Sequence, residues 1–427
     1  MRILYLITGS GGSFYCTNCY RDMIYVRAIK KVKGVDANAI PLYLPPDTLE
    51  DKAEVDPHVF FGAISMFLRE KVRFLRNMPA FFDKILDSAP LLKIAAKQSG
   101  STRTEGLEDL TLDMIKGDNQ FREPEMNRLV KYLGLTGKPD IIHLSNALII
   151  GLAYQLKKKM GVRVVCSLQN EDDWINEMAE PFGSKAWKMI AEESVNVDAF
   201  VSPSNYYKDF FISKTGIPGD KIHVVPSGFE PQPDKEPGET DRPPAIGYFS
   251  RVSLHNGFDK LAEAFIKLKS GDFPDLTLHV CGGYTGDDKP FIREQIQKIR
   301  EKGFKSSVRI YPEFIGNAKE EFFSNIDLMS VPVRKYDGYG LYILEANASR
   351  VPVVQPGTGS FPEILNRTGG GIIYSPDTVD ELANSISNLL KDKSLRLKLG
   401  NQGNNIVRKE FNTLSMAEGL AEIYEKL

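Results

Sequence analysis

The stretch DGYGLYILEANASRVPVV, in the last quarter of the chain, contains two acidic residues eight positions apart, Asp337 and Glu345. A Gly-Tyr-Gly sequence follows Asp337 and leads into an apolar segment that predicts a helix beginning near Leu341. The first turn of a helix offers N–H groups without helical partners and the positive end of the helix dipole. Glycines let the backbone approach a ligand closely. The spacing therefore predicts an anion-binding turn suited to a diphosphate, formed by Gly338, Tyr339, Gly340, Leu341 and Tyr342.

The two carboxylates give this turn a second kind of chemistry. Asp337 stands at its mouth, and Glu345 follows inside the helix, where it can accept hydrogen bonds from vicinal hydroxyls such as those of ribose. Acceptor oxygens beside an anion-binding turn suit a sugar nucleotide. The spacing alone leaves another interpretation open, in which Asp337 caps the helix and Glu345 is solvated.

The elements that must position these residues alternate between strand and helix. Helices are predicted in the first half at Asp22–Lys33, Ala147–Met160, Ser184–Val195 and Tyr206–Thr215. Runs rich in valine and isoleucine predict buried parallel strands at Arg2–Ile7, Asn38–Leu44, Asp140–Leu144, Arg163–Leu168, Ala199–Ser202 and Ile222–Val225. This order is typical of a doubly wound α/β fold.

A proline-rich and charged stretch, residues 229–244, interrupts the pattern and predicts an exposed linker. The alternation then restarts, with strands at Ala245–Phe249, Leu276–Val280, Val308–Ile310, Asp327–Val331, Pro352–Gln355 and Gly371–Ile373. Helices are predicted at Phe258–Lys269, Lys289–Lys302, Ala318–Asn325, Leu341–Ala348 and Thr378–Lys391. We therefore expect two Rossmann-like domains, residues 1–228 and 245–410, with a ligand cleft beyond the carboxyl ends of their strands.

Residues 49–133 do not fit this alternation, because they lack a strand pattern. They predict a mostly helical insertion in the first domain. Within it, residues 60–97 carry seven Lys or Arg against three Asp or Glu. The alternatives that stay open are a helical subdomain packed on the core, an acceptor-binding cap, or a peripheral membrane contact.

Composition excludes several classes of protein. A formal net charge of −2 gives no electrostatic reason to expect nucleic acid. The start MRILYLITGSGG has the pattern of a first strand rather than of a signal peptide. Four scattered cysteines are too few for a disulfide framework, so we expect a cytoplasmic protein, with association at the inner membrane surface as a further expectation.

Cys16 and Cys19 form a C-x-x-C, but no second pair of ligands with zinc-site spacing occurs elsewhere in the sequence. We expect these residues to serve packing or loop structure. Metal binding or redox chemistry is the other interpretation. Otherwise we expect no metal and no cofactor.

The stretch YDGYGLYILEANASRVPVVQPGTGSFPEIL resembles the donor-binding segment of the retaining GT-B glycosyltransferases of family GT4. That pattern has an acid, Gly-aromatic-Gly, a second acid eight positions on, Gly-x-Pro-Val-Val and a Gly-rich turn ending in Glu. This chain departs from it before the proline, where Arg350 and Val351 stand and the glycine is missing. The segments VSPSNYYKDFFISKTGIPGDKIHVVPSGFEP and IGYFSRVSLHNGFDKLAEAF are similar to those that close the family's first domain and open its second. The resemblance implies a GT-B fold whose last helix, residues 411–427, returns to the first domain.

The resemblance also assigns roles to residues. Arg251 matches the family's diphosphate-binding Arg, and Glu345 and Asp337 match its ribose-binding and sugar-binding acids. The Lys expected five residues after the Arg is Asn256, and the first acid, usually Glu, is Asp337. Since Asn can donate a hydrogen bond but carries no charge, one stabiliser of the leaving group is missing.

Further ligand contacts are expected in the first domain. The resemblance places the loop carrying Gly11, Gly12 and Ser13 near the donor phosphate and the acceptor. His143 ends a strand and should point into the cleft, either orienting an acceptor or serving as a satisfied core histidine, and Ser145 stands where many members have a second His. The three acids of residues 171–173 could bind a hydroxyl-rich acceptor or a cation, or cap the next helix.

The implied reaction is transfer of a sugar, with retention of configuration, from a nucleotide diphosphate sugar to an acceptor hydroxyl on a glycan, lipid or small molecule. Residues 311–314 are expected beside the base. Two alternatives remain open at this stage: a pseudo-glycosyltransferase that binds a sugar nucleotide without transfer, and a GT-B sugar-nucleotide epimerase. The departure at Asn256 is the main reason for considering the first.

Overall fold

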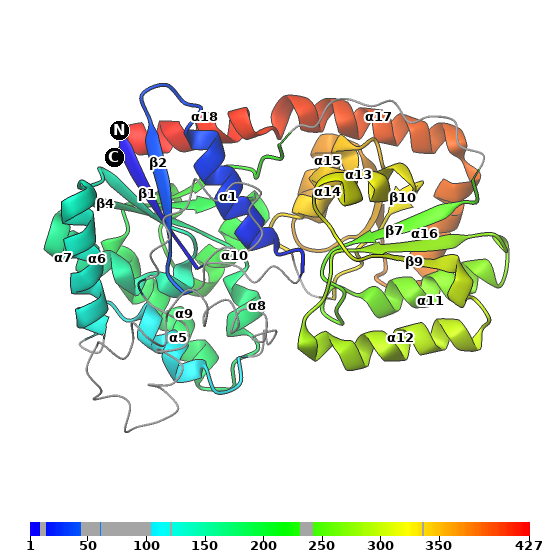
Figure 1. Ribbon diagram of the computed structural model, residues 1–427, viewed down its shortest axis with the longest axis horizontal. Helices are drawn as coiled ribbons and strands as arrows, with labels where there is room; N and C mark the ends of the chain where they lie inside the picture. Colours follow the sequence, from blue (N-terminus) through cyan, green and yellow to red (C-terminus); the bar gives the residue numbers. More distant parts are fainter. Residues whose placement is uncertain (9–13, 44–59, 61–103, 120–121, 231–241, 335–336) are drawn as a thin grey trace. The chain divides into compact units, whose positions relative to one another are not determined.

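The computed structural model describes residues 1–8, 14–43, 60, 104–119, 122–230, 242–334 and 337–427. The chain divides into two compact units (Figure 1). The first unit consists of Met1–Gly12, Asn18–Pro226 and Met416–Leu427, and the second of Ser13–Thr17 and Ser227–Ser415. The C-terminal end of the chain thus belongs to the first unit, and a short N-terminal segment belongs to the second.

The first unit is built on a six-stranded parallel sheet with the strand order β2-β1-β3-β4-β5-β6. Its strands β3 and β5 are buried along their whole length, as expected of parallel strands covered on both faces. The strands are β1 (Arg2–Ile7), β2 (Asp36–Pro41), β3 (Ile141–Leu144), β4 (Arg163–Ser167), β5 (Ala199–Ser202) and β6 (Ile222–Val224).

Helices pack on this sheet through two apolar clusters. One cluster joins β1, α1 and the C-terminal helix α18, whose Met416, Leu420 and Tyr424 are buried in it. The helices are α1 (Thr17–Ile29), α5 (Glu108–Ile115), α6 (Glu123–Thr136), α7 (Gly151–Met160), α8 (Glu171–Ile175), α9 (Phe182–Glu193), α10 (Asn205–Thr215) and α18 (Thr413–Glu425), with short 3₁₀ turns η4 (Ala147–Ile149), η5 (Ser194–Asn196) and η6 (Gly219–Lys221).

The second unit repeats the plan with a parallel sheet in the order β12-β11-β10-β7-β8-β9. The first strand, β7, is buried along its whole length. The strands are β7 (Ala245–Phe249), β8 (Thr277–Cys281), β9 (Val308–Tyr311), β10 (Leu328–Met329), β11 (Val353–Pro356) and β12 (Gly371–Tyr374).

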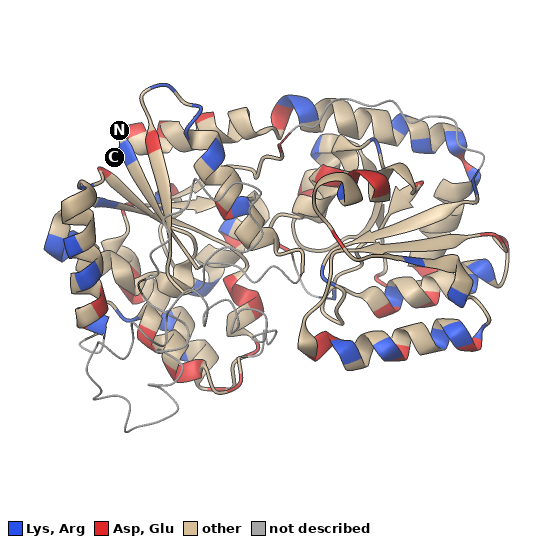
Figure 2. Ribbon diagram, in the orientation of Figure 1, with Lys and Arg blue, Asp and Glu red and all other residues tan. Residues whose placement is uncertain are grey.

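Amphipathic helices cover this second sheet. Basic and acidic side chains are interspersed on the helices of both units, in keeping with the small net charge (Figure 2). The elements are α11 (Phe258–Lys269), α12 (Lys289–Glu301), α13 (Gly316–Ser324), α14 (Leu341–Ala348), α15 (Phe361–Thr368), α16 (Val379–Lys391) and α17 (Lys393–Glu410), with η7 (Gly286–Asp288) and η8 (Lys305–Ser307).

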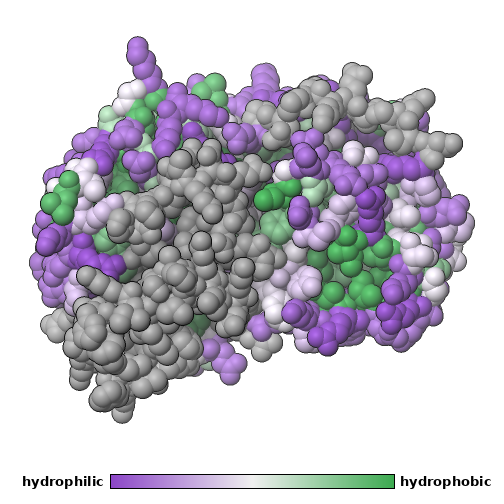
Figure 3. Space-filling view, viewed as in Figure 1, coloured by the Kyte–Doolittle hydropathy of each residue, from purple (hydrophilic) through white to green (hydrophobic). Residues whose placement is uncertain are grey.

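The edge strand β9 leaves apolar surface open to solvent. Its Ile310 is 57% exposed, and Ile315, which follows the strand, is 39% exposed. Figure 3 shows an apolar area on the visible face of the second unit.

The doubly wound α/β prediction is confirmed, and most element bounds agree within a few residues. Three predicted elements have other bounds. The second strand runs from Asp36 to Pro41, the first helix runs from Thr17 to Ile29, and the predicted strand Asp327–Val331 has only two ladder residues, Leu328 and Met329. Beyond Met329, the backbone N–H of Val331 donates to the side-chain Oε1 of Gln355 at 3.0 Å rather than to a backbone carbonyl, so the regular ladder does not continue.

Much of the predicted insertion, including residues 61–97, lies outside the described residues, as does most of the predicted linker. The described part of the insertion holds helices α5 and α6 and no strand. No helix among the described residues is long and apolar enough to cross a membrane.

Candidate functional site

The glycine turn before α14 is organised by Asp337. Its Oδ1 accepts hydrogen bonds from the backbone N–H groups of Tyr339 and Gly340, both at 3.0 Å. Gly340 has φ +48°, and a Cβ there would lie 3.1–3.3 Å from the side chains of Ile343, Ile364 and Phe361. A side chain at this position would therefore be both strained and crowded. The capping role considered for Asp337 is confirmed, because its carboxylate closes the turn.

Helix α14 begins directly after Gly340. The N–H groups of Leu341 and Tyr342 belong to its first turn, where a helix supplies no carbonyl partner. The predicted anion-binding turn thus has the expected helix behind it. Glu345 lies in the second turn of the same helix.

Glu345 is buried rather than solvated, so that interpretation was wrong. Its side chain is only 4% exposed. The phenol of Tyr15 donates to its Oε2 at 2.7 Å, and Lys319 Nζ on α13 lies 2.9 Å from its Oε1. A buried carboxylate is costly unless it is paired and hydrogen-bonded, and both conditions are met here.

Tyr15 reaches Glu345 from a short N-terminal segment that is part of the second unit. Its N–H donates to the carbonyl of Gly282 at 2.7 Å, and Phe14 forms an isolated bridge with Gly283. The ring of Tyr15 packs 4.7 Å from that of Phe249 and 6.4 Å, edge-on, from that of Phe314 (centroid distances). The segment is therefore seated at the carboxyl ends of β7 and β8.

Arg251 is held by Asp288 through a bidentate ion pair. Nε donates to Oδ2 at 2.8 Å and Nη2 donates to Oδ1 at 3.0 Å, while Nη2 also meets Thr285 Oγ1 at 3.0 Å. The guanidinium lies over the ring of Phe14, 5.2 Å from its centroid. Within the part of the chain that the structure describes, Nη1 has no hydrogen-bond partner. Arg251 thus has one fixed N–H edge to offer to an anion.

Asn256 supports the loop of Arg251 from within. Its amide donates to Ser250 Oγ at 2.9 Å and to the carbonyl of Arg251 at 3.0 Å. The amide donors expected to meet a donor phosphate are therefore engaged in the loop. Its role in this structure is to shape the loop that carries Arg251.

The expectation that His143 faces a ligand was wrong. The side chain is fully buried, with Nδ1 at the hydroxyl of Tyr424 and Nε2 at Ser167 Oγ. It stacks on Tyr5 at a centroid distance of 4.7 Å. Burial, with Arg21 nearby, lowers its pKa to about 3, so the ring is neutral. His143 is the satisfied core histidine of the second interpretation.

Ser145 is also buried and serves packing contacts. Its carbonyl accepts from Arg21, and its hydroxyl accepts from Asn146 at 3.3 Å. At 2% exposure, it presents little surface to a ligand.

The acids of residues 171–173 lie in the first turn of α8, whose N-cap position is held by Asn170 without a capping hydrogen bond from its side chain. The prediction that one of these acids caps the helix was therefore wrong. Glu171 accepts hydrogen bonds from the N–H of Ala147 at 2.8 Å and from Tyr207 at 2.7 Å. Burial raises the pKa of Asp172 to about 7.

The remaining predicted site residues give less information. Gly11, Gly12 and Ser13 lie outside the described residues. Cys16 and Cys19 are half-buried and form no disulfide with one another. Among the described residues, no group of three or more His, Cys, Asp or Glu side chains is arranged to hold a metal ion.

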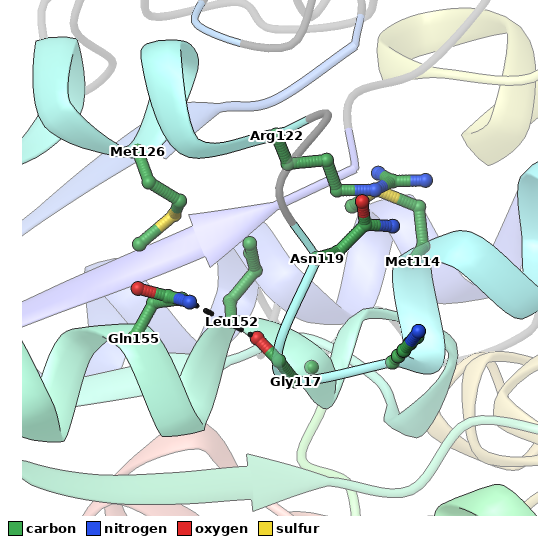
Figure 4. A pocket seen from close by; sticks show the side chains of 9 residues that line it. Met114, Gly117, Asn119, Arg122, Met126, Leu152 and Gln155 are labelled. Carbon is green, nitrogen blue, oxygen red and sulfur yellow. Dashed lines mark hydrogen bonds between the residues drawn. The ribbon is translucent and has the colours of Figure 1, made fainter.

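The first unit also contains a small cavity between α5, α6 and α7 (Figure 4). Gln155 donates across it to the carbonyl of Gly117 at 3.3 Å. Its lining includes Met114, Asn119, Arg122, Met126 and Leu152 and none of the residues predicted from the sequence to form the site.

Two units, each a doubly wound parallel sheet, define the GT-B class of fold. The solved structures most similar in fold include sucrose-phosphate synthase from Thermosynechococcus elongatus, with a TM-score of 0.71, 16% identity and coverage of 100% of this chain and 98% of that one. The Anabaena protein Alr3699/HepE in complex with UDP and glucose has a TM-score of 0.69 and 15% identity, and both chains are covered completely.

Sequence comparison gives the family. Residues 230–406 match the family model Glycosyl transferases group 1, and residues 113–232 match Glycosyltransferase Family 4. The chain belongs to the GT4-type glycosyltransferases of the GT-B fold.

Named relatives are distant. The lipopolysaccharide core biosynthesis mannosyltransferase LpsB of Rhizobium meliloti is 28% identical over 188 residues, 43% of this chain and 51% of that protein. The alpha-maltose-1-phosphate synthase of Mycolicibacterium smegmatis is 24% identical over 251 residues, 54% of this chain and 63% of that protein. The chain thus matches only about half to two-thirds of the length of these relatives.

Proposed function

We propose that the chain transfers a sugar from a nucleotide diphosphate sugar to an acceptor hydroxyl, with retention of the anomeric configuration. Arg251 and the first N–H groups of α14 would bind the diphosphate. Asp337 would hold hydroxyls of the donor sugar through Oδ2, since Oδ1 is committed to the turn. Glu345 would bind the ribose.

One observation carries this proposal. Two consecutive residues, Phe14 and Tyr15, contact Arg251 and Glu345 respectively. The guanidinium and the buried carboxylate therefore both border the place of one dipeptide, and we infer that one extended ligand would contact both. A cation for phosphates together with an acceptor for hydroxyls suits a nucleoside diphosphate.

The residues proposed here are suited to a reaction without an enzyme nucleophile. The bond between the anomeric carbon and the phosphate oxygen breaks, and the acceptor oxygen bonds to the same face of that carbon. The departing phosphate oxygen takes the acceptor's proton. Negative charge accumulates on the diphosphate in the transition state, and Arg251 Nη1 together with the N–H groups of Leu341 and Tyr342 would stabilise it.

The relatives support this class of substrate. Alr3699/HepE of Anabaena was solved with UDP and with UDP-glucose, and a Mycobacterium tuberculosis relative is named a GDP-mannose-dependent phosphatidylinositol monomannoside mannosyltransferase. Such names favour an acceptor that belongs to a surface glycan or a glycolipid. Residues 60–97 remain our candidate for a peripheral membrane contact with a lipid acceptor.

The proposal is tested by measuring release of nucleoside diphosphate from a panel of UDP-, GDP- and ADP-sugars, with and without candidate acceptors and in the presence of EDTA. We expect release from one donor class, an increase with acceptor, and no dependence on metal. Conversion of a donor sugar to its epimer without acceptor would show an epimerase instead. Binding without transfer or hydrolysis would show a pseudo-glycosyltransferase.

A further inference from the structure

We propose that Phe14 and Tyr15 occupy the nucleoside's place in the donor site, so that a donor binds only by displacing them. This inference rests on the proposed function. It makes Tyr15 a residue that determines donor affinity, although neither the glycine pattern nor the acid pair predicts it.

The hydroxyl of Tyr15 stands in for a ribose hydroxyl. It donates to Glu345 Oε2 at 2.7 Å, the same hydrogen bond that a ribose hydroxyl would make to this carboxylate. Glu345 is 4% exposed and Tyr15 is 6% exposed, so the phenol closes the carboxylate off from solvent. A ribose cannot reach Glu345 while the phenol is in place.

Of the two groups bonded to Glu345, Tyr15 is the one that can leave. Removing the ammonium group of Lys319, 2.9 Å from Oε1, would leave a buried carboxylate without its cation, which is strongly unfavourable. Removing the phenol exchanges one neutral hydroxyl donor for another, and the carboxylate remains hydrogen-bonded. The chemistry of the exchange therefore favours displacement of Tyr15.

The ring of Tyr15 stands in for the base. It packs between Phe249, at the end of β7, and Phe314, which follows β9. A nucleobase is also a flat aromatic ring and can make the same tilted and edge-on contacts with these side chains. Phe314 is among residues 311–314, which the sequence analysis expected beside the base.

Phe14 covers the side of the site where Arg251 would bind the diphosphate. Its ring lies under the guanidinium of Arg251 at 5.2 Å, a cation–π contact that a diphosphate would replace with a stronger charged hydrogen bond. The backbone of the segment is attached through the bridge to Gly283 and the hydrogen bond to Gly282. One dipeptide thus contacts both Arg251 and Glu345 where the donor would bind.

Displacement lowers the observed affinity, because the donor binds only the fraction of molecules in which the segment is open. Calorimetric titration with UDP, GDP and ADP of the full chain and of Tyr15→Phe and Tyr15→Ala tests this. We expect Tyr15→Phe to bind the preferred nucleotide about fivefold more tightly, the scale of one hydrogen bond. Tyr15→Ala should bind it more tightly still. Tyr284→Phe, at an exposed tyrosine of the same unit, is the matched control.

The outcomes separate the inference from the proposed function. Unchanged or weaker nucleotide binding by both Tyr15 variants, with measurable binding by the unmodified chain, overturns the displacement proposal alone. Absence of binding by the unmodified chain and by every variant overturns the proposed function as well. Thermal unfolding of each variant identifies any loss of fold, and Tyr15→Phe keeps the ring if Tyr15→Ala is unstable.

Discussion

Asp288 binds Arg251 with both carboxylate oxygens, at 2.8 Å to Nε and 3.0 Å to Nη2. The pair fixes the plane of the guanidinium and leaves Nη1 as the N–H edge available to a phosphate. Thr285, whose hydroxyl also contacts Nη2, strengthens this arrangement. A cation that is oriented before the donor arrives stabilises leaving-group charge without reorganising during the reaction.

Arg251→Ala should lower kcat by about 100-fold, the scale of losing one transition-state donor. Steady-state transfer assays with the preferred donor measure this effect. Arg293→Ala, at an exposed arginine of α12, is the control and should keep full activity. Equal activities of the two variants would remove Arg251 from the mechanism.

Asp288→Ala should lower kcat by roughly tenfold through misplacement of Arg251, with a smaller change in nucleotide affinity. Asp288→Glu, which restores the carboxylate, should recover part of the loss. If Asp288 had a purely structural role, Asp288→Ala would lower thermal stability, and kcat and nucleotide affinity would fall together. Parallel measurement of kcat, nucleotide Kd and Tm distinguishes the two roles.

The fold was largely predictable from the sequence, because buried parallel strands and amphipathic helices leave a periodic pattern over many residues. The turn at Asp337 and Gly340 was predictable for a similar reason, since all its parts are neighbours in the chain. The partners Asp288, Lys319 and Tyr15 were missed, because each comes from a distant segment and leaves no signal at the site's own motif. His143 was misplaced because strand periodicity does not tell which buried polar groups find internal partners.

Gly340→Ala should weaken nucleotide binding and lower stability. At φ +48° an alanine costs about 1 kcal/mol or more, and its Cβ would crowd Ile343, Ile364 and Phe361. Gly286→Ala, where a Cβ would meet nothing within 4 Å, is the matched control. Denaturant unfolding and nucleotide titration of both variants provide the test, and equal behaviour would show that the turn tolerates a side chain.

Asp172 should make stability depend on pH. Burial raises its folded pKa to about 7 from 3.8, so the folded state holds a proton that the unfolded chain has released. The contribution of Asp172 to the free energy of unfolding is therefore fully present below the unfolded pKa of about 4. It is lost as the pH rises from about 4 to the folded pKa of about 7. Asp172→Asn should remove this loss, which urea unfolding at pH 5 and pH 8 would reveal as a smaller difference than in the unmodified chain. An unchanged difference would mean that other groups control this pH range.

The most direct test of the account is calorimetric titration of nucleoside diphosphates into the unmodified chain, Glu345→Ala and Glu345→Gln. The control is Glu294→Ala, at an exposed glutamate of α12. Because the phenol of Tyr15 competes for this carboxylate, each substitution is also compared in a Tyr15→Phe background. There we predict saturable binding of one nucleotide with Glu345 intact and with the control, and binding weakened by both Glu345 substitutions. Full affinity in both Glu345 variants would contradict the central claim that this buried carboxylate holds the donor.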